Sequence, residues 1–484
     1  MSSKMLQFTR LEQQMPDKRP ADTRRQDFDE IYAGFEAERA GDQASRCEQC
    51  GIPFCQIHCP LGNHIPDWLM LTASGRLEEA YAISSATNNM PEVCGRICPQ
   101  DRLCEGSCVL EQSRHSAVTI GAVEKYITDT AWEKGWVKPV KPEVERTESV
   151  GIIGGGPAGM AAAEELRKQG FQVHVYDRYD RIGGLMVYGI PGFKLEKDVI
   201  ARRVALLEEA GVHFHPNSDI GGTISFDALQ AKHDAVLIAT GVYKARRLTI
   251  PGAGLTGVHK ALDYLITSNK VSLGDSVAAY EDGTLNANGK DVVVIGGGDT
   301  AMDCVRTAIR QGAKSVKCLY RRDRDNMPGS QREVANAEEE GVEFEWLAAP
   351  EALLNDGTGN RVTGVRSIRM HLGVADASGR QKPQPIDGSA FTVPADLVIE
   401  ALGFEPEDLP GLFGQDALKV TDWGTIKTNP RTLMSAMDGV FAAGDIVRGA
   451  SLVVWAIRDG RDAAAAIGRY LNVKASQGSL VAAQ

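Results

Sequence analysis

The sequence predicts an α/β protein in which a helical, cysteine-rich N-terminal domain precedes two doubly wound domains with parallel sheets. Two observations predict this fold class. Eight of the ten cysteines lie between Cys47 and Cys108, in a polar region with helical spacing of its apolar residues. After a charged, proline-containing linker at 138–148, a unit of strand, glycine turn, helix and strand occurs twice, at 149–177 and 290–322. Such units build doubly wound nucleotide-binding domains.

Composition and charge argue against a nucleic-acid-binding protein and against a membrane-spanning one. The chain has 484 residues and a net charge of −11, which argues against nucleic-acid binding. No run of about 18 apolar residues is present. The first twenty residues are polar and lack an apolar signal segment. We therefore expect a cytoplasmic protein without a membrane span, whose cysteines are metal ligands or redox groups rather than disulfides.

Within the N-terminal domain, the spacing of apolar residues predicts one helix over 67–86 and another over 118–136. The two cysteines outside this domain, Cys304 and Cys318, are expected in the core.

The cysteines of the N-terminal domain form two groups, and each group is followed or interrupted by proline. They read Cys47-x2-Cys50-x4-Cys55-x3-Cys59-Pro60 and Cys94-x3-Cys98-Pro99-x4-Cys104-x3-Cys108. Four cysteines within thirteen residues are typical of ferredoxin-like iron–sulfur ligation. Zinc, which usually takes two CxxC arms around a longer insert, and disulfides are the alternatives. The spacing favours two four-iron clusters.

Two assignments of ligands are open. In the first, each sequence group holds one cluster. In a crossed assignment, Cys47, Cys50, Cys55 and Cys108 hold one cluster. Cys59, Cys98 and Cys104 then hold the other, with Cys94 or another residue as the fourth ligand.

The first glycine turn, Gly154-x-Gly156-x-x-Gly159, lies between a predicted strand and a predicted helix. Its glycines permit a tight turn and close approach to a pyrophosphate, which the helix N-terminus favours. Asp177 ends the following strand, where an acid accepts hydrogen bonds from ribose hydroxyls. This context predicts a dinucleotide site.

The second glycine turn is Gly296-x-Gly298-x-x-Ala301, with the alanine that the motif permits. Its following strand ends in Arg321 and Arg322 where an NAD site would carry an acid. Arginine binds a 2′-phosphate in bidentate geometry, so this site is predicted to bind NADPH. The alternative is a solvated basic strand end.

Two further features favour FAD at the first site. Small residues close two strands, at 239–241 and 401–403. Asp445 follows a buried strand and a glycine, where its carboxylate would bind ribityl hydroxyls or, alternatively, cap a helix. A helix within 449–460 would point its N-terminal dipole at the reduced flavin.

The residues expected at the FAD site are Gly154, Gly156, Pro157, Ala158, Gly159, Asp177, Arg178, Gly184, Thr240, Gly241, Gly444 and Asp445. Those expected at the NADPH site are Gly296, Gly298, Asp299, Thr300, Ala301, Arg321 and Arg322. No catalytic side chain is expected, because the cofactors carry hydride transfer.

From about residue 27 to about residue 465, the chain resembles the small (β) subunits of NADPH-dependent glutamate synthase. The resemblance rests on the combination CEQCGIPFCQIHCPLGNHIPDW, PEVCGRICPQDRLCEGSCVL, VTIGAVEKYI, GIIGGGPAGMAAA, VVVIGGGDTAMDC and FAAGDI. The same module resembles the N-terminal part of dihydropyrimidine dehydrogenase and the large subunit of NADH-dependent ferredoxin:NADP oxidoreductase.

The resemblance implies a helical domain with two four-iron clusters at 1–145, followed by adrenodoxin-reductase-like FAD and NADPH domains. The FAD domain would occupy 146–245 and 396–484, with the NADPH domain inserted at 246–395. The resemblance to dihydropyrimidine dehydrogenase implies the crossed assignment and an oxygen ligand sixteen residues beyond the last cysteine. That position is Glu124, where the relative has glutamine, and Cys94 is the alternative ligand.

The implied function is electron input. NADPH is oxidised through FAD, and the clusters pass electrons to a large (α) subunit carrying FMN, which makes L-glutamate from glutamine and 2-oxoglutarate. The alternatives are a subunit of an NAD(P)H:ferredoxin-type oxidoreductase and, in another class, a non-enzymatic redox sensor or scaffold.

Overall fold

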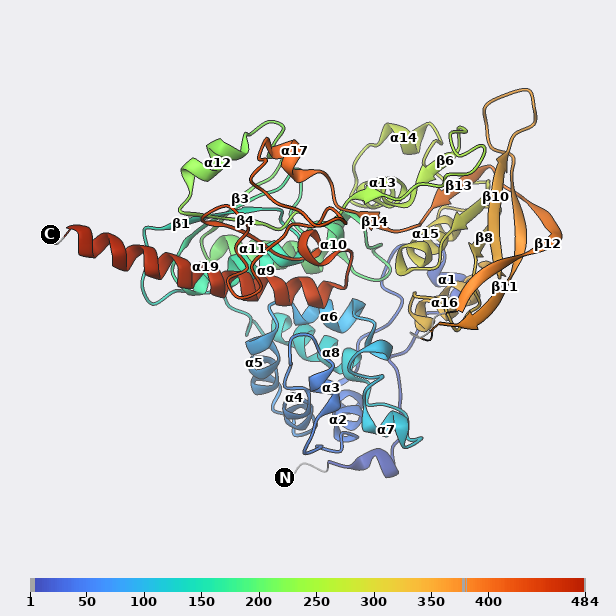
Figure 1. Cartoon of the computed structure of the whole chain (residues 1–484). Coiled ribbons are helices and arrows are strands. Elements are labelled where there is room, and N and C mark those ends of the chain that lie inside the picture. The colour runs from blue at the N-terminus through green and yellow to red at the C-terminus, as the bar shows by residue number, and fades with distance from the viewer. Residues whose placement is uncertain (1–4, 377–378, 380, 483–484) are drawn as a thin grey trace.

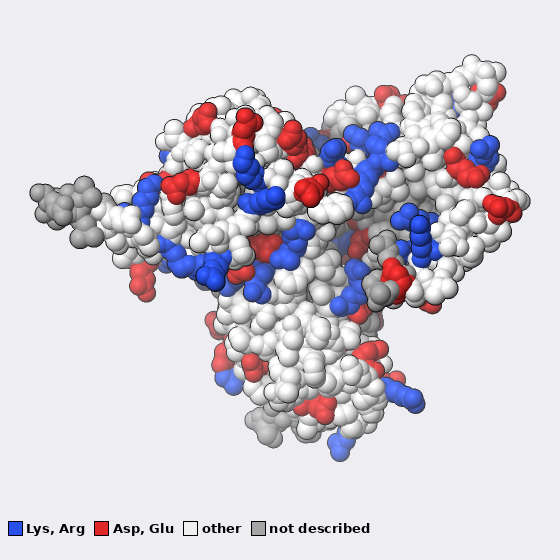
Figure 2. Space-filling view, viewed as in Figure 1, with Lys and Arg blue, Asp and Glu red and all other residues white. Residues whose placement is uncertain are grey.

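The structure, a computed structural model, describes residues 5–376, 379 and 381–482. A helical domain lies at the base of the molecule, and two α/β domains lie side by side above it (Figure 1). None of the described helices is both long and apolar enough to span a membrane. Acidic and basic side chains are interspersed over the face shown in Figure 2, and they form no single basic surface there.

The helical domain packs around Trp68, which is fully buried. Its indole N–H donates to the Asn63 side chain, whose amide in turn donates to Glu124. Its elements are η1 (Gln7–Thr9), α1 (Ala21–Arg24), α2 (Ala37–Ser45), α3 (Phe54–Ile57), α4 (Ile65–Ala73), α5 (Leu77–Thr87), α6 (Pro91–Ile97), η2 (Gln100–Arg102), α7 (Val109–Gln112) and α8 (Ile120–Glu133).

The single helix predicted over 67–86 is wrong, because two helices, α4 and α5, occupy this stretch. Gly75 follows the C-cap of α4 with a φ of +75°, in the left-handed region that ends helices. Apolar periodicity continues on both sides of this turn, so the periodic pattern did not reveal the break. The helix predicted over 118–136 is present as α8.

The first α/β domain has a five-stranded parallel sheet in the order β15-β4-β1-β2-β3. Its elements are β1 (Ser149–Ile153), α9 (Pro157–Lys168), β2 (Gln172–Tyr176), α10 (Leu185–Tyr188), α11 (Lys197–Glu209), β3 (Val212–His215), α12 (Phe226–Lys232), β4 (Ala235–Ile238), β5 (Lys244–Ala245), β14 (Phe404–Glu405), α17 (Leu409–Phe413), β15 (Val440–Ala442), α18 (Asp445–Arg448) and α19 (Val453–Ala482).

The second α/β domain has a five-stranded parallel sheet, β6-β13-β7-β8-β9, and an antiparallel sheet, β10-β11-β12. Cys304 and Cys318 are fully buried in its core. Its elements are β6 (Val258–Lys260), α13 (Ala261–Ser272), α14 (Ala278–Glu281), β7 (Asp291–Ile295), α15 (Asp299–Arg310), β8 (Ser315–Tyr320), α16 (Gln331–Glu339), β9 (Glu343–Trp346), β10 (Ala348–Leu354), β11 (Gly364–Ala375), β12 (Gln381–Pro394) and β13 (Leu397–Glu400).

The chain leaves the first α/β domain through β5 and returns through β14, and these two strands pair with each other. The second α/β domain is therefore inserted in the first, and the chain enters it after β5 and leaves it before β14, at points that lie next to each other in space. β13 pairs with β6 and β7, so the second sheet extends to Glu400. The boundary expected at residue 395 would separate this central strand from its sheet.

Helix α19 extends from the first α/β domain to the C-terminal end of the molecule (Figure 1). It crosses α9 closely, because Gly460 has no side chain and a Cβ there would lie 2.2 Å from the Ala158 carbonyl. This contact places the N-terminal end of α19 beside the glycine turn of the first domain.

Candidate functional site: one cavity shared by three domains

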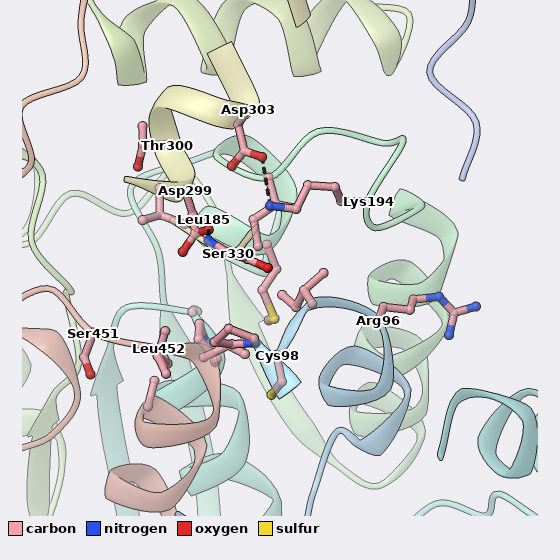
Figure 3. Close-up of a pocket in the computed structure, with 18 of the residues that line it drawn as sticks. Arg96, Cys98, Leu185, Lys194, Asp299, Thr300, Asp303, Ser330, Ser451 and Leu452 are labelled. Carbon is pink, nitrogen blue, oxygen red and sulfur yellow. Dashed lines mark hydrogen bonds and ion pairs between the residues drawn. The ribbon is translucent and has the colours of Figure 1, made fainter. Parts of the chain in front are cut away.

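A cavity of about 340 Å³ lies where the three domains meet. The first α/β domain contributes its glycine turn and Asp445, the second contributes Asp299 and Thr300, and the helical domain contributes Cys98. Figure 3 shows Cys98 in the lower part of the view, Ser451 and Leu452 to its left, and Asp299 and Thr300 above them. Residues expected at three separate cofactor sites thus share one central cavity.

The first glycine turn has the form of a phosphate cradle. Gly154 has a φ of +108°, and a Cβ there would lie 2.4 Å from the Ala239 carbonyl, which explains the glycine. A Cβ on Gly159 would lie 2.0 Å from the Gly154 carbonyl, so this glycine allows α9 to pack on β1. At Gly156, by contrast, a Cβ would meet no atom within 4 Å. The space beside Gly156 is therefore open to a ligand.

Polar groups converge on the same part of the cavity. The Asp177 carboxylate accepts hydrogen bonds from the backbone N–H groups of Gly155 at 2.7 Å and Tyr179 at 2.9 Å. Burial raises the pKa of Asp177, although these N–H groups oppose the rise. The buried hydroxyl of Thr240 has no hydrogen-bond partner among the described residues. A buried hydroxyl without a partner at a cavity wall fits a polar ligand such as FAD.

Asp445 also lines the cavity, and it is not a helix cap. Gly444 is the N-cap of α18, and Asp445 is the first residue of that helix. The Ser451 backbone lies close to its carboxylate. Burial raises the pKa of Asp445 to about 6, with the Ser451 backbone opposing the rise and the neighbouring Asp459 adding to it.

Two residues expected at the first site, Arg178 and Gly184, support it rather than line the cavity. The Arg178 guanidinium pairs with Glu407 at 3.0 Å and lies 4.6 Å from the Tyr243 ring centroid. At Gly184, a Cβ would lie 2.9 Å from the Gly156 Cα. Pro157, Ala158, Gly241 and Gly444 are among the cavity-lining residues.

The second glycine turn repeats this design. A Cβ on Gly296 would lie 2.2 Å from the Ala401 carbonyl, whereas one on Gly298 would meet no atom within 4 Å. Ala301 is fully buried in the core, where a larger residue would push α15 off its sheet. The Asp299 carboxylate accepts from the Ser330 N–H at 2.9 Å, which ties the turn to the start of α16.

Arg321 and Arg322 follow β8 and do not line the central cavity. In the part of the chain that the structure describes, neither guanidinium has an ion pair, while the nearby Arg324 pairs with Glu338 at 2.8 Å. Two unpaired guanidinium groups at the end of this strand fit an incoming phosphate.

All ten cysteines are described, and all are free thiols. Four of them line a second, small hollow of about 20 Å³ in the helical domain: Cys47, Cys50, Cys55 and Cys108. This is the set that the crossed assignment places on one cluster. Burial and the neighbouring thiols raise the pKa of Cys47 to about 11 and that of Cys55 to about 12.

The remaining cysteines lie near Glu124. The thiol of Cys98 lies close to Cys94, Cys104 and Glu124, and together with burial these groups raise its pKa. Cys59 interacts with Glu124 and Cys94. Burial raises the pKa of Glu124 to about 8, and its carboxylate accepts from Asn63 at 3.1 Å and Asn88 at 3.4 Å. Of the two candidates for the fourth ligand, Glu124 therefore lies near Cys59, Cys98 and Cys104, and Cys94 lies near Cys59 and Cys98.

Several cavity residues had no sequence signal. They come from loops and helix faces in segments far apart in the chain: Arg96, Gln100, Leu185, Lys194, Tyr243, Asp303, Ser330, Arg332 and Glu333. Among these residues, only Arg96 and Gln100 could have been suspected from sequence, because they flank Cys98 and Pro99 in the cysteine pattern.

Two protein-family models match this chain, one in its N-terminal region and one over the rest. Residues 24–136 match the family described as dihydropyrimidine dehydrogenase domain II, 4Fe-4S cluster. Residues 148–460 match the pyridine nucleotide-disulphide oxidoreductase family. The structure of FprA from Mycobacterium tuberculosis in complex with NADPH superposes with a TM-score of 0.57 at 21% identity, covering 69% of this chain and 86% of that one. At this identity the likeness concerns the fold.

Full-length relatives are more specific. The NADPH glutamate synthase small chain of Azospirillum brasilense is 70% identical over 483 residues, which cover 100% of both chains. That of Escherichia coli K12 is 45% identical over 477 residues, covering 98% of this chain and 100% of the relative. With its iron–sulfur domain and its nucleotide-binding fold, the chain belongs to the family of NADPH glutamate synthase small chains.

Proposed function

We propose that this chain is the electron-input subunit of an NADPH-dependent glutamate synthase. When bound, FAD would accept a hydride from NADPH and release the electrons singly to 4Fe–4S clusters. The single observation that carries the proposal is the shared cavity, in which Gly156, Asp299 and Cys98 line the same space. Donor, flavin and first iron–sulfur centre would therefore lie next to one another.

The first α/β domain would hold FAD. The open space at Gly156 and the N-terminus of α9 suit the pyrophosphate, because backbone N–H groups there favour negative charge. Thr240, Asp177 and Asp445 supply polar groups along the cavity. The N-terminal end of α19 adds a dipole that favours negative charge on the flavin.

The second α/β domain would hold NADPH. Gly298 leaves space for its pyrophosphate at the start of α15, and Arg321 with Arg322 would take the 2′-phosphate. NADPH is preferred to NADH because these arginines stand where an acid would otherwise repel that phosphate.

The helical domain would hold two 4Fe–4S clusters in the crossed arrangement. Cys47, Cys50, Cys55 and Cys108 share the small hollow, which supports one site. Cys59, Cys98 and Cys104 would form the other with Cys94 or Glu124. Cys98 lines the central cavity, so the cluster held by Cys59, Cys98 and Cys104 would receive electrons first. The cluster held by Cys47, Cys50, Cys55 and Cys108 would then pass them on.

A small chain implies a large-subunit partner. We propose that this partner carries FMN and makes L-glutamate from glutamine and 2-oxoglutarate. A cytoplasmic location, where thiols stay reduced, is part of the proposal.

The test is to purify the chain with its native partner and to follow NADPH oxidation anaerobically. We expect oxidation that requires both glutamine and 2-oxoglutarate, and, for the isolated chain, NADPH-dependent reduction of an artificial acceptor only. Copurification with a ferredoxin-reducing partner would favour the oxidoreductase alternative. A flavin-free chain that reduces no acceptor would overturn the proposal in favour of a sensor or scaffold.

A further inference from the structure

One buried side chain links the two α/β domains across the wall of the central cavity. Lys194 lies in the segment between α10 and α11 of the first α/β domain. Its ammonium is 2.9 Å from the Asp303 carboxylate on α15 and 3.8 Å from that of Glu333 on α16, both in the second α/β domain. Figure 3 shows Lys194 and Asp303 joined across the space between the two domains.

The ion pair is largely buried, since the Lys194 and Asp303 side chains are only 14% and 8% exposed. Burial lowers the pKa of Lys194, but the carboxylates of Asp303, Glu333 and Asp299 outweigh it and hold the pKa above its ordinary value. Burial raises the pKa of Asp303 to about 6, with Lys194 opposing the rise. A charge left without its partner here would be strongly unfavourable.

The buried charges continue behind this pair into the rest of the second α/β domain. Glu333 accepts from Arg306 at 2.6 Å, and Arg306 pairs with Glu340 at 2.8 Å. Glu340 also pairs at 2.8 Å with Arg24 of α1, an N-terminal helix that lies beside α16 (Figure 1). The ring of Phe193, in the first α/β domain, lies 4.4 Å from the Arg306 guanidinium. Side chains of both α/β domains and of the N-terminal segment therefore meet in one buried network, and Lys194, Asp303 and Glu333 form the part that lines the cavity.

We propose that Lys194 is a positioning residue, whose ion pair with Asp303 holds the second α/β domain in the orientation that hydride transfer requires. The inference rests on the proposed function. Reacting atoms must lie about 3–3.5 Å apart, and a misplacement of about 1 Å can cost about 100-fold in rate. The two α/β domains are joined covalently only at β5 and β14, so non-covalent contacts between them set this distance. Arg181 pairs with Asp275 at 2.7 Å elsewhere between the two domains, whereas the Lys194–Asp303 contact lies at the wall of the cavity itself.

The test compares Lys194→Met, Lys194→Arg, Asp303→Asn and the double variant Lys194→Met/Asp303→Asn with wild type, each as the flavin- and cluster-containing chain. Rapid-mixing absorbance under anaerobic conditions gives the limiting rate of flavin reduction by NADPH. Calorimetry gives the dissociation constant for NADP⁺. Hydrogen exchange of the nucleotide-free chain reports opening of segments 190–196 and 299–310.

We expect Lys194→Met to slow flavin reduction by about 10- to 100-fold. The NADP⁺ dissociation constant should stay within about threefold of wild type. Exchange should be faster in both segments, and Lys194→Arg should restore rate and protection. The double variant leaves no unpaired charge, so it should fold even if Lys194→Met folds poorly, and it should be as slow as Lys194→Met.

Lys314→Met is the matched control, because it removes an ion pair with Asp291 inside the second α/β domain, away from the cavity. It should leave the rate of flavin reduction unchanged. A normal rate in Lys194→Met and in the double variant would overturn the inference while the proposed function stands. So would weaker NADP⁺ binding at an unchanged limiting rate, since Lys194 would then be a nucleotide ligand. A wild-type flavin that NADPH cannot reduce would overturn both.

Discussion

Cys47 and Cys108 line the same small hollow, although Cys47 lies two residues beyond the end of α2 and Cys108 directly precedes α7. Helix α8 and the buried Trp68 belong to the core that brings these two segments together. This arrangement favours the crossed assignment of iron ligands over assignment by sequence group.

Cys47→Ser, Cys108→Ser and the double variant should each lose the same cluster, about four of eight irons, because the two thiols serve one site. Iron analysis and electron paramagnetic resonance of the reduced chain measure this loss. Cys304→Ala is the control, since that buried thiol lies in the second α/β domain and should leave iron unchanged. Loss of both clusters in the double variant alone would instead support assignment by sequence group.

For the second cluster, we expect Cys94 to be the fourth ligand. Its thiol lies beside that of Cys98, and thiolate is the common ligand of iron in such clusters. The Glu124 carboxylate is instead held by two asparagine amides. Cys94→Ser should therefore change the paramagnetic resonance signal of this cluster, whereas Glu124→Gln should leave its signal and the iron content as in wild type. The reverse result would assign the position to Glu124.

Two glycines of the first turn should respond differently to the same substitution. Gly156→Ala should leave thermal stability unchanged but weaken FAD binding about tenfold or more, because the new methyl group enters the space for the phosphates. Gly159→Ala should destabilise the chain by about 1–3 kcal/mol, because its methyl group would press on the Gly154 carbonyl. Thermal unfolding and flavin titration distinguish the two. Equal loss of stability in both variants would argue against a ligand at Gly156.

Replacing Arg321 and Arg322 by glutamine should reduce kcat/KM for NADPH by about 10- to 100-fold, because charge-assisted bonds to the 2′-phosphate are lost. Activity with NADH, which lacks this phosphate, should hardly change. Steady-state reduction of an artificial acceptor measures both. Arg324→Gln is the control, since this arginine is paired with Glu338. An equal decrease for both nucleotides would show that the pair supports the fold rather than the phosphate.

Asp445 predicts a dependence of stability on pH. Its folded-state pKa of about 6 lies above the ordinary 3.8, so folding favours the neutral acid. This contribution is complete below about pH 4 and is lost as the pH rises through 6. At pH 8, Asp445→Asn in the flavin-free chain should therefore be more stable than wild type by about 3 kcal/mol. Near pH 4, wild type and Asp445→Asn should unfold at the same temperature. A stability difference that does not change with pH would contradict the raised pKa of Asp445.

Local sequence was enough to predict the α/β class, both glycine turns and the iron–sulfur character of the N-terminal domain. Each of these depends on short-range constraints. Gly154 needs its positive φ, and the buried strands β1 and β7 carry runs of apolar β-branched residues. Spacing within 47–59 and 94–108 suffices to recognise iron ligands, because their pattern is set within a few turns of chain.

Packing between distant segments decided the rest. The break at Gly75, the pairing of β13 with the second sheet and the hollow shared by Cys47 and Cys108 depend on contacts that no local pattern encodes. Lys194 has no motif around it, and its importance appears only where Asp303 lies 2.9 Å away on another domain. Periodicity reports which face of an element is buried, whereas the partner that covers this face is set by the whole chain. For that reason the glycine turns and the cysteine groups could be predicted from sequence, but the single cavity that unites them could not.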